Sequence, residues 1–99
     1  MKNAEIIASL ESIIDAAEYM KNAYFFTPPT NASGRRAYEK RWTRPEIEWT
    51  EGGHTYTAAY TVSCSCRNVY AVGTYTRDGK KTTLTAIRNS LHRLQAAAQ

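Results

Sequence analysis

Long hydrophobic runs are missing from this chain. Its 99 residues are 42% hydrophobic, yet no run approaches the roughly 18 consecutive apolar residues that a membrane-spanning helix needs. Acidic residues enter the apolar pattern soon after Met1, so we expect no secretory leader and no membrane association. A chain of this length is expected to fold as a single domain over residues 1–99.

Cysteine is also scarce. The two cysteines, Cys64 and Cys66, have one residue between them, and a disulfide over so short a span is strained. We therefore expect free thiols, which are typical of a reducing, cytoplasmic compartment. With His54 and His92 they would supply four zinc ligands by type, but zinc sites favour two to four residues between paired cysteines. The sequence consequently predicts no metal and no cofactor.

Patterns that carry catalysis are absent as well. The chain has no Gly-rich phosphate loop, and no order of Ser, His and acid, or of Cys and His, stands out as a nucleophilic site. Glu46 and Glu48 share one face of a predicted strand, but no neighbouring motif indicates a pocket around them. We therefore expect a binding protein rather than an enzyme.

Charge is distributed unevenly along the chain. Residues 1–33 hold two basic and four acidic residues, whereas residues 34–99 hold eleven basic and five acidic ones, and the net charge is +4. A positive field over two thirds of a chain favours an acidic partner, of which nucleic acid is the commonest. A surface that merely keeps the protein soluble would explain the same charge.

Two segments have helical periodicity. Residues 4–22 are predicted to form a helix with Asn3 as its N-cap, because apolar residues recur there at spacings of three and four. These residues are Ile6, Ile7, Leu10, Ile13, Ile14 and Ala17. Residues 81–97 are predicted to form a second helix on the same grounds. Its apolar residues are Leu84, Ile87, Leu91 and Leu94. Both stripes are expected to face the core.

Between these helices the apolar residues recur at every second position. Ile47 and Trp49 alternate with polar residues, Gly52-Gly53 indicates a turn, and from Tyr56 onward larger or apolar residues alternate with hydroxyl-bearing ones. Such alternation is typical of antiparallel strands with one solvated face. We predict a three-stranded meander over residues 45–76. The expected fold is therefore α+β, with two layers in the order α-β-β-β-α and both helices packed on one sheet face.

Residues 23–44 are predicted to be a basic and aromatic insertion loop, in which residues 35–42 could form a short helical turn. The Pro28-Pro29 pair ends the preceding helix. The basic and aromatic residues that follow are Arg35, Arg36, Tyr38, Lys40, Arg41, Trp42 and Arg44. Guanidinium groups pair with phosphates and aromatic rings stack on unpaired bases, so this composition suits nucleic acid. The alternative is a polar linker whose Trp42 packs on the domain.

Several motifs in the second half of the chain are similar to those of a known family. They are Pro45-Glu-Ile-Glu-Trp49, Glu51-Gly-Gly-His54, Tyr60-Thr-Val62, Gly73 and Lys80-Lys81. In this order the chain resembles a double-stranded-RNA-binding domain, mainly over residues 45–94. The resemblance implies contacts to duplex shape and phosphates from the first helix, the Gly…His turn and a lysine pair that opens the last helix. This sequence departs from the family in lacking the turn proline and a third lysine, and in its acidic first helix.

The predicted interface combines the basic loop with the lysine pair. Lysines at a helix N-terminus suit phosphate because backbone N–H groups and the helix dipole add to their charge; a solvated helix start is the alternative. The predicted nucleic-acid-binding residues are Arg35, Arg36, Lys40, Arg41, Trp42, Arg44, His54, Arg77, Lys80, Lys81 and Arg88. The expected partner is duplex or structured RNA, or else DNA.

A second hypothesis comes from a different functional class. Tyr24, Phe25 and Phe26, together with the arginine-rich loop, would also serve a protein interface, where aromatic residues and arginine concentrate. In size and in its lack of catalytic residues the chain resembles, as a class, small phage-encoded inhibitors such as anti-CRISPR proteins. The alternative function is therefore an accessory protein that binds a nucleic-acid-processing protein complex.

Overall fold

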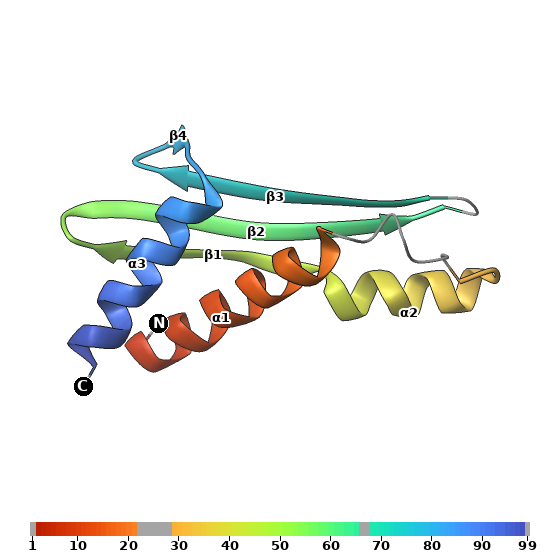
Figure 1. The fold of residues 1–99 in the computed structure, drawn as a ribbon, viewed down its shortest axis with the longest axis horizontal. Coiled ribbons are helices and arrows are strands. Elements are labelled where there is room, and N and C mark those ends of the chain that lie inside the picture. Colours follow the sequence, from red (N-terminus) through yellow and green to blue (C-terminus); the bar gives the residue numbers. More distant parts are fainter. Residues whose placement is uncertain (1, 22–28, 66–67, 99) are drawn as a thin grey trace.

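The fold is a single antiparallel sheet with helices along one of its faces. A computed structural model describes residues 2–21, 29–65 and 68–98. The elements are α1 (Asn3–Met20), α2 (Ala32–Trp42), β1 (Arg44–Glu51), β2 (His54–Cys64), β3 (Val69–Arg77), β4 (Lys80–Lys81) and α3 (Leu84–Ala97). The strand order is β1-β2-β3-β4 (Figure 1). The α+β class is confirmed, but over the described residues there are three helices and four strands where two and three were predicted.

The hydrophobic core lies between the sheet and its helices. Alternate residues of β2 face the helices, and those buried are Tyr56, Ala58, Tyr60 and Val62. From the helices, Leu10 and Ile87 are both fully buried, at 0% exposure. The other buried apolar residues in the described segments are Ile6, Ile13, Ala16, Ala17, Met20, Trp49, Leu91 and Leu94. The period of two in β2 and the helical stripes of α1 and α3 were therefore predicted correctly as the core-facing sets.

One polar contact crosses this core. The indole N–H of Trp49, on β1, donates to the hydroxyl of Ser90, on α3, over 3.0 Å. Ser90 is 0% exposed, so the pair satisfies two polar groups that water does not reach. Trp49 also stacks on Tyr56 with ring centroids 5.3 Å apart. These contacts join the first strand, the second strand and the last helix.

The segment between α1 and β1 differs from the prediction. Residues 32–42, predicted as a loop with at most a helical turn, form the eleven-residue helix α2. The helix begins there because Asn31 Oδ1 accepts the backbone N–H of Gly34 over 2.6 Å, as an N-cap side chain does. Tyr24, Phe25 and Phe26 lie outside the described residues. No residue of this helix is fully buried, but its partly buried Tyr38 and Trp42 pack against the core.

The ends of the other helices also shift. Asn3 is the first residue of α1 rather than its cap; Lys2 precedes the helix with no side-chain capping bond, so the N-cap prediction was wrong. The last helix begins at Leu84 rather than 81, because the Thr83 hydroxyl accepts the N–H of Ala86 over 3.2 Å. Lys80 and Lys81 therefore do not open a helix, as predicted, but form strand β4.

Strand β4 exists because of a two-residue turn. Asp78 and Gly79 both have positive φ, at 53° and 79°, which is the geometry of the tight turn that joins antiparallel strands. Arg77 consequently pairs with Lys80 and Thr76 with Lys81. The Gly52-Gly53 turn between β1 and β2 also has positive φ at both residues, at 62° and 80°. These two turns lie at the same end of the sheet (Figure 1).

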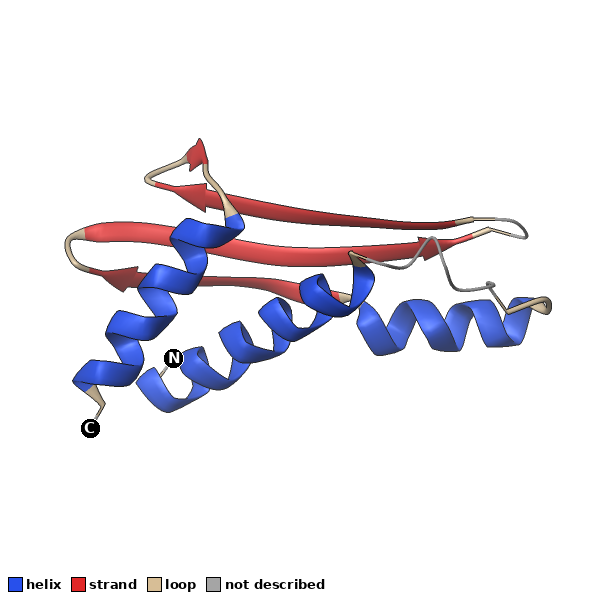
Figure 2. Ribbon diagram, in the orientation of Figure 1, coloured by secondary structure: helices blue, strands red, loops and turns tan. Residues whose placement is uncertain are grey.

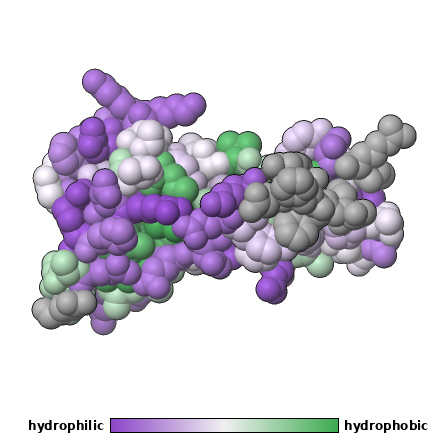
Figure 3. Space-filling model, in the orientation of Figure 1, coloured by the Kyte–Doolittle hydropathy of each residue, from purple (hydrophilic) through white to green (hydrophobic). Residues whose placement is uncertain are grey.

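The molecule is elongated, with extents of 45 × 25 × 20 Å. Helix α2 lies at one end of the long axis, and the two turns and β4 lie at the other, while the helices form one layer against the sheet (Figure 2). No helix within the described segments is both long and apolar enough to cross a membrane. In the view of Figure 3 most of the surface is hydrophilic, with small hydrophobic areas between polar side chains.

Candidate nucleic-acid interface

A polar cavity lies at the end of the molecule where the two turns meet. Its volume is about 340 Å³. The lining residues are His54, Arg77, Asp78, Lys80, Lys81 and Thr82. They come from the start of β2, the end of β3, the turn, β4 and the residue that follows β4. The two hairpins thus bring together His54 and the lysine pair, which were predicted as separate contacts.

Asp78 holds this end in place. Its Oδ1 accepts the backbone N–H of Thr55 over 2.9 Å, and its own N–H donates to the carbonyl of Thr55 over 2.7 Å. Its Oδ2 lies 2.6 Å from His54 Nδ1. The hydrogen bond with the His54 side chain, followed by that from Thr55, holds the pKa of the Asp78 carboxyl below its ordinary value. Asp78 therefore docks the β3–β4 hairpin onto the start of β2.

The charge around the cavity is positive. Arg77, Lys80 and Lys81 are exposed and line it together, against the single carboxylate of Asp78. Asp78 is already paired with His54 Nδ1, so the other ring nitrogen, Nε2, is the one that remains to meet a ligand. Exposed single ion pairs contribute little to binding, but several cations around one concave surface suit a multiply charged anion such as a phosphate ester.

The basic residues of α2 lie at the opposite end of the molecule (Figure 1). Arg36, Lys40 and Arg41 are exposed, whereas the Arg35 guanidinium donates to the carbonyl of Thr30 over 2.8 Å. The structure thus separates the predicted basic residues into two clusters along the long axis. We name Arg36, Lys40 and Arg41 the α2 cluster, and the residues around the polar cavity the His54 cluster.

Trp42 is already packed. Its ring stacks on Tyr19 of α1 with centroids 4.0 Å apart and planes 7° from parallel. The guanidinium groups of Arg41 and Arg44 lie 5.1 and 5.8 Å from its ring centre. These contacts cover ring surface on which a base would stack, as the packed-linker interpretation of Trp42 expects.

Two predicted cations serve contacts within the protein. Arg44 Nε donates to the Ser12 hydroxyl over 2.6 Å and to its carbonyl over 3.3 Å, which ties β1 to α1. Arg88 of α3 forms an ion pair with Glu18 of α1. Neither residue lines the polar cavity. Their assignment to the interface rests on charge alone and stays a prediction, because charge does not distinguish a ligand contact from an internal one.

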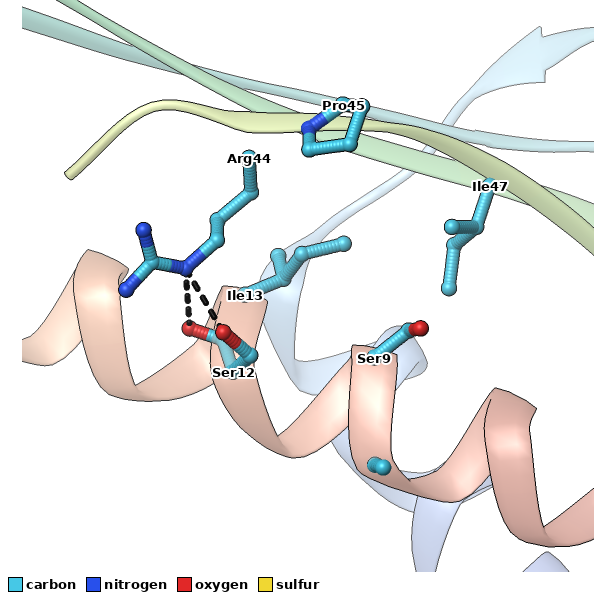
Figure 4. A pocket seen from close by; sticks show the side chains of 7 residues that line it. Ser9, Ser12, Ile13, Arg44, Pro45 and Ile47 are labelled. Carbon is cyan, nitrogen blue, oxygen red and sulfur yellow. Dashed lines mark hydrogen bonds between the residues drawn. The ribbon is translucent and has the colours of Figure 1, made fainter. Parts of the chain in front are cut away.

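A second cavity lies between α1 and β1 and has a different character (Figure 4). Its volume is about 270 Å³. The lining residues are Ala8, Ser9, Ser12, Ile13, Arg44, Pro45 and Ile47. The wall is mainly apolar. The guanidinium of Arg44 reaches across the cavity to Ser12, as Figure 4 shows. This cavity offers no cluster of charges for a polyanion.

The cysteine and histidine side chains form no recognisable metal centre in the described segments. No group of three or more His, Cys, Asp or Glu residues is arranged there as metal ligands would be. Cys64 is a free, half-buried thiol, and its pKa is raised by burial and then by the Glu39 carboxylate. It therefore stays protonated and weakly nucleophilic at neutral pH. Cys66 lies outside the described residues.

Sequence reasoning missed Asp78 and Thr82 as members of the site. The signal for Asp78 was present, because Asp-Gly flanked by strand residues is the commonest sign of a two-residue hairpin. The prediction used Arg77-Asp78-Gly79 as the end of a strand and did not continue it into a returning one. Thr82 has no comparable sequence signal; its backbone N–H donates to the carbonyl of Tyr75 over 2.9 Å and so extends the β3–β4 pairing.

Comparison of the chain with protein-family models, with curated proteins and with solved structures finds no match. The functional proposal for this protein therefore rests on its own residues and their arrangement.

Proposed function

We propose that this chain binds structured nucleic acid through backbone phosphates at the His54 cluster and catalyses no reaction on it. One observation carries the proposal. Two hairpin turns bring His54, Arg77, Lys80 and Lys81 around a single polar cavity, although His54 and the lysines are far apart in the sequence. Phosphate is the acidic group that several converging cations recognise most often.

The arrangement of the cations suits a charged backbone rather than the bases. All of the cations in the His54 cluster are exposed, so they retain water and contribute through the sum of their charges. Contacts of this kind position a protein on nucleic acid without reading its sequence. We therefore propose affinity that depends strongly on salt and little on sequence.

The resemblance to double-stranded-RNA-binding domains adds a second line of support. Residues from two of the three contacts that it implies, His54 of the Gly…His turn and the lysine pair, line the same cavity in this chain. The third, the first helix, carries Glu5, Glu11, Asp15 and Glu18, which repel phosphate. On this basis we propose that duplex RNA is contacted at the His54 cluster and that the exposed face of α1 is turned away from it.

The test is a salt series with a paired lysine variant. Each phosphate contact releases counterions, so log affinity falls with log salt in proportion to the number of contacts. Lys80→Ala combined with Lys81→Ala should weaken binding to duplexes of any sequence and flatten the salt slope by about two units. Binding would be followed by fluorescence anisotropy with duplex RNA, duplex DNA and single strands.

A matched control removes the same charge elsewhere. Lys2 and Lys21 are exposed and belong to the α1 region rather than to the cavity, so the pair Lys2→Ala and Lys21→Ala should leave most of the affinity and slope unchanged. If both double variants lost the same amount of affinity, the loss would be explained by the change in net charge and not by contacts at the cavity. If the wild type binds no nucleic acid at low salt, the proposal fails, and the accessory protein that binds a nucleic-acid-processing complex becomes the leading hypothesis.

A further inference from the structure

Strand β3 leaves most of its outer edge without a strand partner. It spans Val69–Arg77, but β4 pairs with Thr76 and Arg77 alone. Within the described residues, β2 is the one strand paired with residues 69–75. An edge of this length offers unpaired N–H and C=O groups to any strand that can approach it.

The two edges of the sheet differ in how they are protected. β1, at the opposite edge, contains Pro45 and three glutamates, and its pairing with β2 shifts register between Arg44 and Ile47. Proline, charge and irregular register are the usual devices that keep an edge strand from pairing further. Residues 69–75 contain no proline and no charged residue. The β3 edge is therefore open to pairing in a way that the β1 edge is not.

The orientation of the free groups follows from one hydrogen bond. The carbonyl of Tyr75 accepts the N–H of Thr82 on the β4 side, so Tyr75 directs its backbone groups away from β2. Because this direction alternates along a strand, Val69, Ala71 and Gly73 direct theirs outward as well. Tyr70, Val72 and Thr74 bond to β2 instead. Because Tyr75 is already bonded to Thr82, the free edge consists of the outward groups of Val69, Ala71 and Gly73.

We propose that the β3 edge is a self-association surface, on which a second copy of this chain adds its own β3 in antiparallel orientation. Val72 lies at the two-fold axis. Ala71 of each copy then pairs with Gly73 of the other copy. Each such pair exchanges both backbone hydrogen bonds. The two Ala71–Gly73 pairs carry the backbone hydrogen bonds, and the ladder ends there because the next pair would need the Tyr75 carbonyl, which already accepts the N–H of Thr82. The two sheets then form one continuous sheet.

The side chains fit this register. Val72 and Tyr70, which are 60% and 58% exposed, lie on the sheet face away from the core. Val72 meets Val72 of the second copy at a pair without hydrogen bonds, where Cα atoms approach to about 4.5 Å, and Tyr70 meets Thr74. Aromatic and β-branched residues are the pairs that stabilise neighbouring strands most. On the core-facing side the opposed residues are Ala71 and Gly73, and the Tyr75 side chain lies over Gly73 in place of a side chain of its own.

The first test measures mass against concentration without nucleic acid. Sedimentation velocity of the wild type should show a shift from 11.2 kDa to twice that mass as concentration rises. Val72→Lys sets two like charges against each other at the axis and should abolish the dimer. Thr50→Lys adds the same charge to the β1 edge and should leave it intact. A wild type that stays monomeric up to millimolar concentration, or a dimer unaffected by Val72→Lys, would overturn the proposal.

A second variant tests the same edge in case Val72→Lys fails to fold. Ala71→Pro removes an N–H that points away from β2, so it should spare the β2–β3 ladder and still prevent dimerisation. Hydrogen exchange followed by NMR gives an independent readout. The amides of Ala71 and Gly73 should be protected at high concentration alone, whereas those of Tyr70 and Val72 should be protected at every concentration. The proposed pairing would be contradicted if the Ala71 and Gly73 amides were protected at every concentration. It would also be contradicted by a dimer in which these amides stay unprotected.

Discussion

Among single residues, Ser90 has the most sharply defined role in the core. Its hydroxyl is the acceptor for the Trp49 indole N–H, and the side chain is 0% exposed. Ser90→Ala leaves that N–H buried without a partner, which costs about 1–3 kcal/mol of unfolding free energy. Chemical denaturation should show this loss, whereas Ser63→Ala, at an exposed position on β2, should change stability by less than about 0.5 kcal/mol. Equal stabilities for the two variants would refute the role of the contact.

Three residues predicted to contact a ligand have partners within the protein. Arg44 and Arg88 were assigned to a ligand, but their guanidinium groups contact Ser12 and Glu18. Trp42 was assigned to base stacking, but Tyr19 covers one face of its ring. Each of these residues has the correct chemistry for the predicted role. Each also contacts a residue on another element, and sequence spacing contains no information about contacts between elements.

At the scale of elements, the β3–β4 hairpin decides the shape of the candidate site. Asp78 occupies a left-handed backbone position at its turn and bonds across to His54 and Thr55. The lysines consequently lie on a strand beside His54 rather than at a helix N-terminus. Phosphate would meet side-chain charge there, without the helix dipole that the sequence prediction included.

The same carboxylate makes the stability of this hairpin dependent on pH. The pKa of Asp78 is lowered in the folded protein from an ordinary value of 3.8. Its contribution is therefore present above pH 3.8 and is lost as pH falls through the lower folded pKa. Asp78→Asn keeps a residue that tolerates the left-handed turn but removes the charge. We expect the wild type to melt at a higher temperature than this variant at neutral pH.

The difference between these melting temperatures should shrink as pH falls below 3.8 and vanish in strong acid. Thermal unfolding followed by circular dichroism at a series of pH values measures it. A constant difference across that range would mean that Asp78 acts through its shape and not through its charge.

At the scale of the whole molecule, the 45 Å length keeps the two basic clusters apart. A nucleic acid has to span most of this length to meet both the His54 cluster and the α2 cluster. We predict that neutralising Arg36, Lys40 and Arg41 to alanine weakens binding to a long duplex and leaves binding to a duplex much shorter than 45 Å unchanged. The Lys80→Ala and Lys81→Ala pair should weaken both.

For the long duplex the two sets of substitutions should add in free energy, because distant sites that share no partner are additive to within about 0.5 kcal/mol. Titration of both variants and their combination against duplexes of two lengths tests this. A short duplex that responds to the α2 substitutions would show that the two clusters act as one surface.

The sequence by itself determined the elements whose signal is local and repeated. The stripe through Leu10 and Ile13, the alternation from Tyr56 to Val62 and the stripe through Ile87 and Leu91 each repeat the same preference over many residues, and the buried core follows them. A pattern of that kind survives whatever packs against it, because the hydrophobic effect rewards burial of one face irrespective of the partner.

Only the tertiary structure decided the features that depend on a single long-range contact. The Asp78-Gly79 turn that leads into β4 has a local signal, but the position of Lys80 and Lys81 beside His54 depends on the bonds of Asp78 with Thr55 and His54. Likewise, helix α2 has a weak apolar stripe, and its Trp42 gains a partner when Tyr19 of α1 lies beside it. Such contacts form between residues far apart in the chain, whose encounter depends on the folded backbone and not on spacing in the sequence.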